Sequence, residues 1–228
     1  MANEPAHKIL QIIKVDAQLM DGIKSSFDDL PETDHADGNY RLRKYSKVAI
    51  AKRPPSAETW PEKNYVIKQI DDTTFTQSKK YNTHQGGTDR KFEFIDKDVI
   101  ESKAMYELLS VFYDACGLVN DKYSTSVVDI HQMRIICRGG ATQTTPEGWH
   151  QDGFNCVAII GIDRCNIIGG ELMASTDKTE TPFMKAPLDS GTMLIVDDDY
   201  LWHNGTSIQP IDPESLAYFD ALIFTVKR

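Results

Sequence analysis

The sequence predicts a mainly β fold that carries a few helices on its outside. Two helical patterns occupy the first half of the chain, whereas the second half consists of short β-branched and apolar segments separated by glycine, proline and aspartate. Helices followed by five or more such strands are typical of an antiparallel sandwich or barrel with its helices packed outside. We therefore expect two sheets folded on each other.

The first helical pattern spans residues 16–30. Its apolar residues recur at steps of four, four and three, as on one face of a helix: Leu19, Ile23, Phe27 and Leu30. Residues 40–50 alternate enough to form a strand, and the prolines within residues 52–63 indicate a loop. Residues 64–95 contain short β-like runs broken by Gly86-Gly87.

The second helical pattern spans residues 96–116 and precedes Gly117, a residue type that often ends a helix. Apolar residues recur in it at roughly helical spacing: Val99, Met105, Leu108, Leu109, Phe112, Tyr113 and Cys116. After this helix the pattern changes to strands. We expect five of them, at residues 126–137, 154–162, 166–174, 192–196 and 217–226.

Length and composition indicate one domain. The chain has 228 residues, of which 40% are hydrophobic, so it can bury a core of its own. We expect a single domain over residues 1–228, with 1–120 as a helical and β flanking part and 121–228 as the core that carries the functional site. The net charge of −9 disfavours a nucleic-acid partner, because phosphate binding needs clustered lysine and arginine.

The expected location is the cytoplasm. Residues 1–8 hold no long apolar run behind a basic patch, so we expect neither a signal peptide nor a membrane span. The four cysteines form no Cys-x-x-Cys pair and need no disulfide in a chain of this length. A homodimer is the default expectation for the oligomeric state.

One group of residues points to a metal site. The run Gly-Trp-His-Gln-Asp-Gly places His150 and Asp152 two residues apart, and His203 precedes the last expected strand. On a strand, residues two apart face the same side, so both can point into one cavity. Two histidines and one carboxylate leave one face of an octahedron open, as a mononuclear iron(II) site requires. Hydrolytic zinc sites use the same donors, but the helical His-Glu-x-x-His arrangement is absent from the sequence.

Further motifs occur together in the order and spacing of one enzyme family. They are Arg41–Ser46, Gln77–Asn82 with Gly86-Gly87 and Arg90–Phe92, His131–Arg134, Trp149–Asp152, Asn166–Glu171 and Trp202-His203. With them, the chain from about Arg41 onward resembles the iron(II)/2-oxoglutarate dioxygenases that hydroxylate free amino acids. The resemblance is to the branch typified by bacterial L-isoleucine dioxygenase.

That resemblance implies a double-stranded β-helix (jelly-roll) core. It implies that His150 and Asp152 are the proximal iron ligands and that His203 is the distal one. It also implies Fe(II), 2-oxoglutarate and O2 as cofactor and co-substrates. In the implied reaction, 2-oxoglutarate is converted to succinate and CO2 while an unactivated C–H bond of a free amino acid is hydroxylated.

The chain departs from the family at one position. Members of this branch carry an arginine on the last core strand, one residue before an aspartate, to bind the distal carboxylate of 2-oxoglutarate. Here Phe219 precedes Asp220, and a phenylalanine cannot form a charge-assisted fork with a carboxylate. Either another cation binds this carboxylate or the co-substrate differs. The candidate cations are Arg134, Arg138 and Arg164, of which the first two share one face of an expected strand.

An amino-acid substrate needs a cation for its carboxylate and an acidic or polar partner for its ammonium group. Candidates for the carboxylate are Arg43, Arg134 and Arg138, and candidates for the ammonium group are Glu171, Asp220 and Gln132. Two alternatives stay open. One is an iron oxidase that catalyses desaturation or cyclisation, or that uses a different co-substrate. The other is a metal-binding jelly-roll without catalysis.

Overall fold

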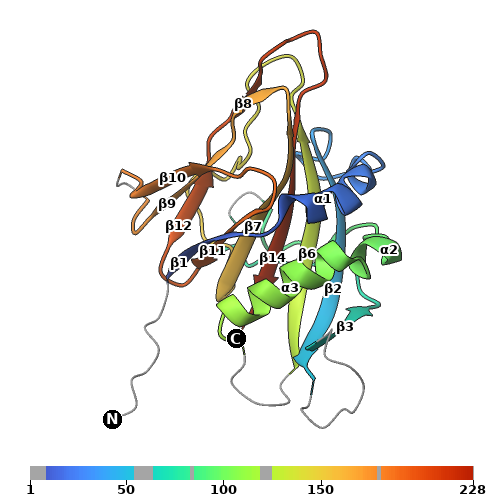
Figure 1. The fold of residues 1–228 in the computed structure, drawn as a ribbon. Helices are drawn as coiled ribbons and strands as arrows, with labels where there is room; N and C mark the ends of the chain where they lie inside the picture. The colour runs from blue at the N-terminus through green and yellow to red at the C-terminus, as the bar shows by residue number, and fades with distance from the viewer. Residues whose placement is uncertain (1–8, 54–63, 83–84, 119–124, 179–180, 228) are drawn as a thin grey trace.

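One seven-stranded antiparallel sheet forms the framework of the protein (Figure 1). Its strands lie in the order β1-β11-β7-β14-β6-β2-β3. Their bounds are β1 (Leu10–Lys14), β2 (Arg41–Lys52), β3 (Tyr65–Ile70), β6 (Thr125–Ile136), β7 (Cys156–Cys165), β11 (Thr192–Asp197) and β14 (Tyr218–Val226). This computed structural model describes residues 9–53, 64–82, 85–118, 125–178 and 181–227.

A three-stranded sheet in the order β10-β9-β12 forms the second layer. Its strands are β9 (Glu171–Ser175), β10 (Met184–Pro187) and β12 (Trp202–Gly205), and two further strand pairs join β8 (Ile167–Gly169) to β13 (Ile208–Pro210) and β4 (Thr74–Phe75) to β5 (Arg90–Lys91). One buried apolar cluster contains Leu172 of β9 together with Leu194 of β11 and Phe219 of β14. One part of the core therefore lies between the two sheets, and the expected mainly β fold is confirmed.

The helices cover the other face of the large sheet (Figure 1). They are α1 (Ala17–Lys24), the short 3-10 helix η1 (Ser25–Phe27), α2 (Lys97–Ile100) and α3 (Lys103–Ala115). A second buried apolar cluster packs the helices against the sheet. In this cluster the ring centres of Phe112 on α3 and Phe224 on β14 are 5.6 Å apart. None of the helices in the described residues is long and apolar enough to cross a membrane.

The helix at 96–116 differs from the prediction in one respect: it is two helices. The side chain of Ser102 accepts a hydrogen bond from the backbone N–H of Met105 at 3.1 Å, so it caps a new helix and separates α2 from α3. Gly117 follows α3 with φ +62, the left-handed conformation expected for a helix stop. The predicted helix at 16–30 ends at Phe27, after one 3-10 turn.

Most expected strands are present with shifted ends. The strands predicted at 40–50, 126–137, 192–196 and 217–226 correspond to β2, β6, β11 and β14. β7 begins at Cys156 and runs to Cys165, later at both ends than predicted, and the strand predicted at 166–174 is divided into β8 and β9. Most of the predicted loop at 52–63, namely residues 54–63, lies outside the described residues, as do residues 1–8.

The two faces of β6 have different neighbours. Its residues Gln132 and Arg134 point toward the helices, where Gln132 donates to the side chain of Ser26 at 2.7 Å. Arg134 donates two bonds of 2.7 Å to Asp220 and one of 2.8 Å to Asp28. The expectation that Gln132, Arg134 and Asp220 face the cavity between the sheets is therefore wrong. Alternation correctly placed Gln132 and Arg134 on one face, but that face packs on the helices.

Replacing Arg134 tests its structural position. Arg134→Met leaves the Asp220 carboxylate, whose side chain is 1% exposed, without its guanidinium partner. Loss of one member of a buried ion pair costs about 3–5 kcal/mol, so the free energy of unfolding measured in urea falls by that amount. Arg138→Met, at a side chain that is 53% exposed, changes it by less than about 0.5 kcal/mol. Weaker 2-oxoglutarate binding in Arg134→Met without loss of stability would contradict this assignment.

Candidate metal centre

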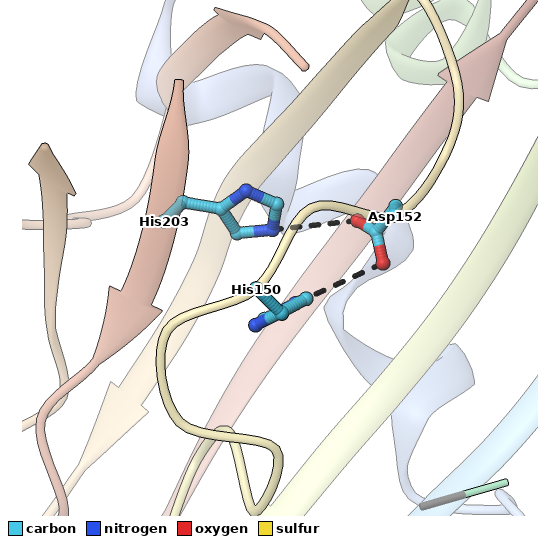
Figure 2. A group of neighbouring side chains, drawn as sticks. All are labelled: His150, Asp152 and His203. Carbon is cyan, nitrogen blue, oxygen red and sulfur yellow. Dashed lines mark ion pairs between the residues drawn. The ribbon is translucent and has the colours of Figure 1, made fainter. Parts of the chain in front are cut away.

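His150, Asp152 and His203 point toward one another (Figure 2), and all three line one cavity. One ligand atom from each lies within 4.8 Å of the others. Oδ2 of Asp152 lies 3.3 Å from Nε2 of His203, and its Oδ1 lies 3.7 Å from Nε2 of His150. The centres of the two imidazole rings are 4.2 Å apart. Three donors from two separate segments therefore surround one point.

Backbone pairing brings the two histidines together. The N–H of His150 donates to the carbonyl of His203 at 3.1 Å, and the N–H of His203 donates back at 3.0 Å. His203 lies on β12, whereas His150 forms an isolated bridge and Asp152 lies in the loop before β7. The expected strand at His150 and Asp152 is thus reduced to one bridge. Gly153 has φ +81, and a Cβ there would meet the ring of Tyr81 at 2.4 Å, so the loop requires glycine.

Hydrogen bonds orient two of the three ligands. Nδ1 of His150 lies 2.8 Å from the carbonyl oxygen of Gly148, so in the neutral ring this nitrogen carries the proton and Nε2 keeps its lone pair for a metal. The Gln77 side chain donates to Asp152 Oδ1 at 2.9 Å. Burial and the neighbouring His203 lower the pKa of His150, which also favours the neutral ligand.

The buried Asp198 carboxylate holds the loop that carries Asp152 and lies near the ring of His203. It accepts the backbone N–H groups of Asp152 at 3.0 Å, Gly153 at 2.7 Å and Phe154 at 3.2 Å. Its Oδ1 lies 3.6 Å from Nδ1 of His203. Burial, together with the nearby Asp152 charge, raises the pKa of Asp198 to about 6. The role of Asp198 that these contacts support is to fix the loop that carries Asp152, because outer-shell hydrogen bonds position metal ligands.

The donor set fits iron(II). Two neutral imidazoles and one carboxylate are the three protein ligands of mononuclear iron sites that leave one face open. Among the described residues this is the one group of three or more His, Cys, Asp or Glu side chains that could hold a metal ion. Its open side faces a cavity that is lined by residues of both sheets.

The cavity wall combines apolar side chains with charges of both signs. The apolar part includes Phe75, Met133 and Phe219, and the charged part is Arg41, Arg43, Arg90, Glu147 and Glu171. Burial and the two guanidinium groups of Arg43 and Arg90 keep the pKa of His131, which also lines the wall, well below its usual range. His131 is therefore a neutral wall residue.

The predicted binding residues divide into three groups. Arg43 and Glu171 line the cavity, as expected of residues that contact a ligand, and Glu171 also pairs with Lys185 at 2.8 Å. Arg138 is exposed and pairs with Glu32 at 2.8 Å, away from the cavity, so its predicted role is wrong. Arg134, Gln132 and Asp220 lie on the opposite face of the sheet, as described above.

Phe219 and Arg164 are direct partners across β14 and β7. Phe219 lines the cavity, at the position where the family resemblance implies an arginine. The Arg164 guanidinium lies 5.4 Å from the Phe219 ring and donates to the carbonyl oxygens of Gly169 and Gly170. Gly170 lines the cavity, so Arg164 lies directly behind the wall, and its role toward 2-oxoglutarate stays a prediction.

Four functional residues had no role in the sequence analysis. Gln77 and Arg90 belong to the motifs quoted there, but the strand pattern did not predict that they lie near the metal ligands. Glu147 lies in a segment without regular structure just before His150. Asp198 belongs to the acidic run Asp197–Asp199 shortly before His203, and this run is the signal that could have pointed to a supporting carboxylate.

A comparison with protein-family models decides the family. The model described as 2OG-Fe dioxygenase matches residues 24–225, which is most of the chain. This chain belongs to the 2OG-Fe dioxygenase family. The family uses Fe(II), 2-oxoglutarate and O2, and the His150–Asp152–His203 group fits the iron.

Three solved structures have a similar fold over most of this chain. A bsmA homolog from Methylobium petroleophilum PM1 is 25% identical with a TM-score of 0.76, over 92% of this chain and 81% of that one. IDO from Bacillus thuringiensis is 17% identical with a TM-score of 0.74, over 96% and 94%. The Fe(II)/(alpha)ketoglutarate-dependent dioxygenase TqaL is 12% identical with a TM-score of 0.66, over 97% and 83%. The predicted jelly-roll core is confirmed, and a comparison with curated proteins gave no match.

The support from Asp198 is tested by a matched pair of variants. Asp198→Asn replaces one of the two acceptor oxygens with an NH2 group, so at least one of the three backbone N–H groups in the loop that carries Asp152 loses its acceptor and faces a donor instead. The dissociation constant for Fe(II) or Co(II), measured anaerobically by titration, is expected to rise about 10- to 100-fold. Asp199→Asn changes the adjacent exposed carboxylate and leaves metal affinity unchanged. Equal affinities in the two variants would show that Asp198 does not support the ligands.

Proposed function

We propose that this enzyme hydroxylates an unactivated C–H bond of a free L-amino acid. Its co-substrates are 2-oxoglutarate and O2, and the products besides the hydroxylated amino acid are succinate and CO2. The observation that carries the proposal is the position of the His150–Asp152–His203 group, which opens into a cavity lined by charges of both signs on apolar walls. Small-molecule sites are usually such cavities with a few well-placed polar groups.

The charges of the wall match a zwitterion. Arg43 is a nearly buried guanidinium and suits the substrate carboxylate. Glu171 and Glu147 suit the ammonium group, and the side chain of Glu147 is 12% exposed and lies 3.9 Å from its nearest cation, Arg41. An apolar stretch of wall that includes Leu172, Ala221 and Ile223 fits an aliphatic side chain. These features support a small amino acid over a peptide or a nucleic acid.

The protein residues hold the reactants and keep water out. Iron(II), when bound, supplies the redox chemistry that couples decarboxylation of 2-oxoglutarate to oxidation of the substrate. His150, Asp152 and His203 hold the metal on one side and leave its other positions open to the cavity. The buried apolar wall around Phe75 and Met133 excludes solvent from the reacting carbon.

Phe219 favours a second candidate function. Because a phenyl ring lines the cavity at the position where the family resemblance implies an arginine, the oxidation can follow a different co-substrate mode or end in desaturation or cyclisation. The products differ in mass. Hydroxylation adds one oxygen atom to the amino acid, whereas desaturation and cyclisation remove two hydrogen atoms.

Two measurements test the proposal. Anaerobic titration of the Fe(II)-loaded enzyme with 2-oxoglutarate is expected to produce a visible charge-transfer band. Turnover with a panel of L-amino acids is then expected to give succinate and a hydroxylated product in equal amounts by mass spectrometry. His150→Ala is the control and is expected to lose both the band and the product, because one of three metal ligands is missing. Absence of the band in the wild-type enzyme would refute the 2-oxoglutarate mechanism, and a product lighter by two hydrogens would select the second candidate.

A further inference from the structure

Two arginines face the cavity from the side of β2 and β5. Arg43 lies on β2, opposite Met133 of β6, and Arg90 lies on β5. Both line the cavity that holds the candidate metal ligands, and both are at least nine-tenths buried, with exposed fractions of 9% and 5%. Their guanidinium groups are therefore available to a molecule in the cavity and shielded from bulk solvent.

Neutral groups hold both guanidiniums. Arg43 donates to the sulfur of Met133 at 3.2 Å, and Arg90 donates to the amide oxygens of Gln77 at 2.8 Å and Gln85 at 3.2 Å. Each also lies over an aromatic ring: Arg43 is 5.6 Å from the ring centre of Phe92, and Arg90 is 5.1 Å from that of Phe75. In the part of the chain that the structure describes, no carboxylate oxygen lies within 4.0 Å of either arginine.

Two other arginines of the described residues, Arg41 and Arg134, have side chains that are 10% and 8% exposed and do have carboxylate partners. Arg41 pairs with Asp37, and Arg134 pairs with Asp220 and Asp28. A buried charge without an opposite charge is costly, so the arrangement at Arg43 stands out. Burial and the neighbouring Arg41 lower the pKa of Arg43 to about 9, which still leaves it protonated at neutral pH. The site thus carries positive charge that the described protein residues do not neutralise directly.

A short chain of hydrogen bonds connects this charge to the metal ligands. The Gln77 side chain accepts from Arg90 at 2.8 Å and donates to Asp152 Oδ1 at 2.9 Å. Asn82 also donates to Gln77 at 3.0 Å and holds the amide in this orientation. The Arg90 guanidinium is therefore two hydrogen bonds away from a candidate iron ligand. Arg90 therefore lies close to the metal ligands, and Arg43 lines the same cavity.

We propose that Arg43 and Arg90 together form a carboxylate-binding site, which anchors the far end of a ligand whose near end lies at His150, Asp152 and His203. The inference rests on the proposed function for the identity of the ligand. The carboxylate is either the distal one of 2-oxoglutarate, in place of the arginine that Phe219 replaces, or that of the amino-acid substrate. Both have the same chemistry, and guanidinium groups bind both by charge-assisted hydrogen bonds.

The test uses two titrations of the anaerobic Fe(II) enzyme. In the first, 2-oxoglutarate is added alone and the charge-transfer band gives its dissociation constant. In the second, an amino acid that the wild-type enzyme oxidises is added to the 2-oxoglutarate complex and its dissociation constant is measured by calorimetry. Arg43→Met and Arg90→Gln are expected to raise the dissociation constant in one of the titrations about 10- to 100-fold. The titration that responds identifies the carboxylate.

Matched variants separate the proposal from a general loss of structure. Arg43→Lys and Arg90→Lys keep the charge but lose the fork, so their affinity is expected to lie between those of wild type and the neutral variants. Arg138→Gln removes an exposed arginine outside the cavity and is expected to change neither constant. The affinity for Fe(II) is also measured in each variant. If a neutral variant binds Fe(II) more weakly than wild type, the ligand affinities of wild type are compared with those of the lysine variant instead.

Unchanged affinity for both ligands in the variants, to within about twofold, would overturn the carboxylate site. The first titration measures binding, so it also separates this proposal from the proposed function. An enzyme that binds 2-oxoglutarate through these arginines but oxidises no amino acid would refute the function and support the site. A wild-type enzyme that binds neither ligand would refute both.

Discussion

The backbone pairing of His150 with His203 is the interaction on which the rest of the site depends. Two hydrogen bonds join the loop before β7 to β12, so ligands that are distant in the sequence meet at one edge of the sandwich. Asp198 then holds the Asp152 loop from behind through three backbone N–H groups. Because main-chain hydrogen bonds position the ligands, the geometry is set before any metal binds. Such preorganisation is what a catalytic metal site requires.

Charge is distributed unequally along the cavity. Two neutral imidazoles and one carboxylate would carry a net positive charge with a divalent cation bound. Arg43 and Arg90, in the same cavity wall, are held by a thioether, amides and aromatic rings. The cavity would therefore hold two positively charged groups joined by Gln77, with Glu147 and Glu171 as further acidic wall residues. An anionic co-substrate balances this distribution better than a neutral one.

The spacing of two histidines and a carboxylate pointed to the metal site, and the order of the flanking motifs, through the family resemblance, assigned the role of each ligand; in the structure the three side chains lie together. The fold class followed from the change between helical and β patterns. The direction of Arg134 could not be predicted, because both faces of β6 are buried: Val128 and Ile130 pack under the helices, whereas Met133 and Ile135 pack between the sheets. A strand with two buried faces gives no hydrophobic alternation to mark the cavity side. β12 was missed because Trp202–Gly205 is short and polar, although it carries His203.

The location of a bound metal tests the central claim most directly. Crystals of the protein soaked anaerobically with Mn(II), which takes similar ligands to Fe(II), are measured at the manganese absorption edge. One anomalous peak is expected within bonding distance of Nε2 of His150, Nε2 of His203 and one carboxylate oxygen of Asp152, with the remaining positions open to the cavity. A peak at other residues, or a metal closed off by a fourth protein ligand, would contradict the assignment of this site as an oxygenase centre.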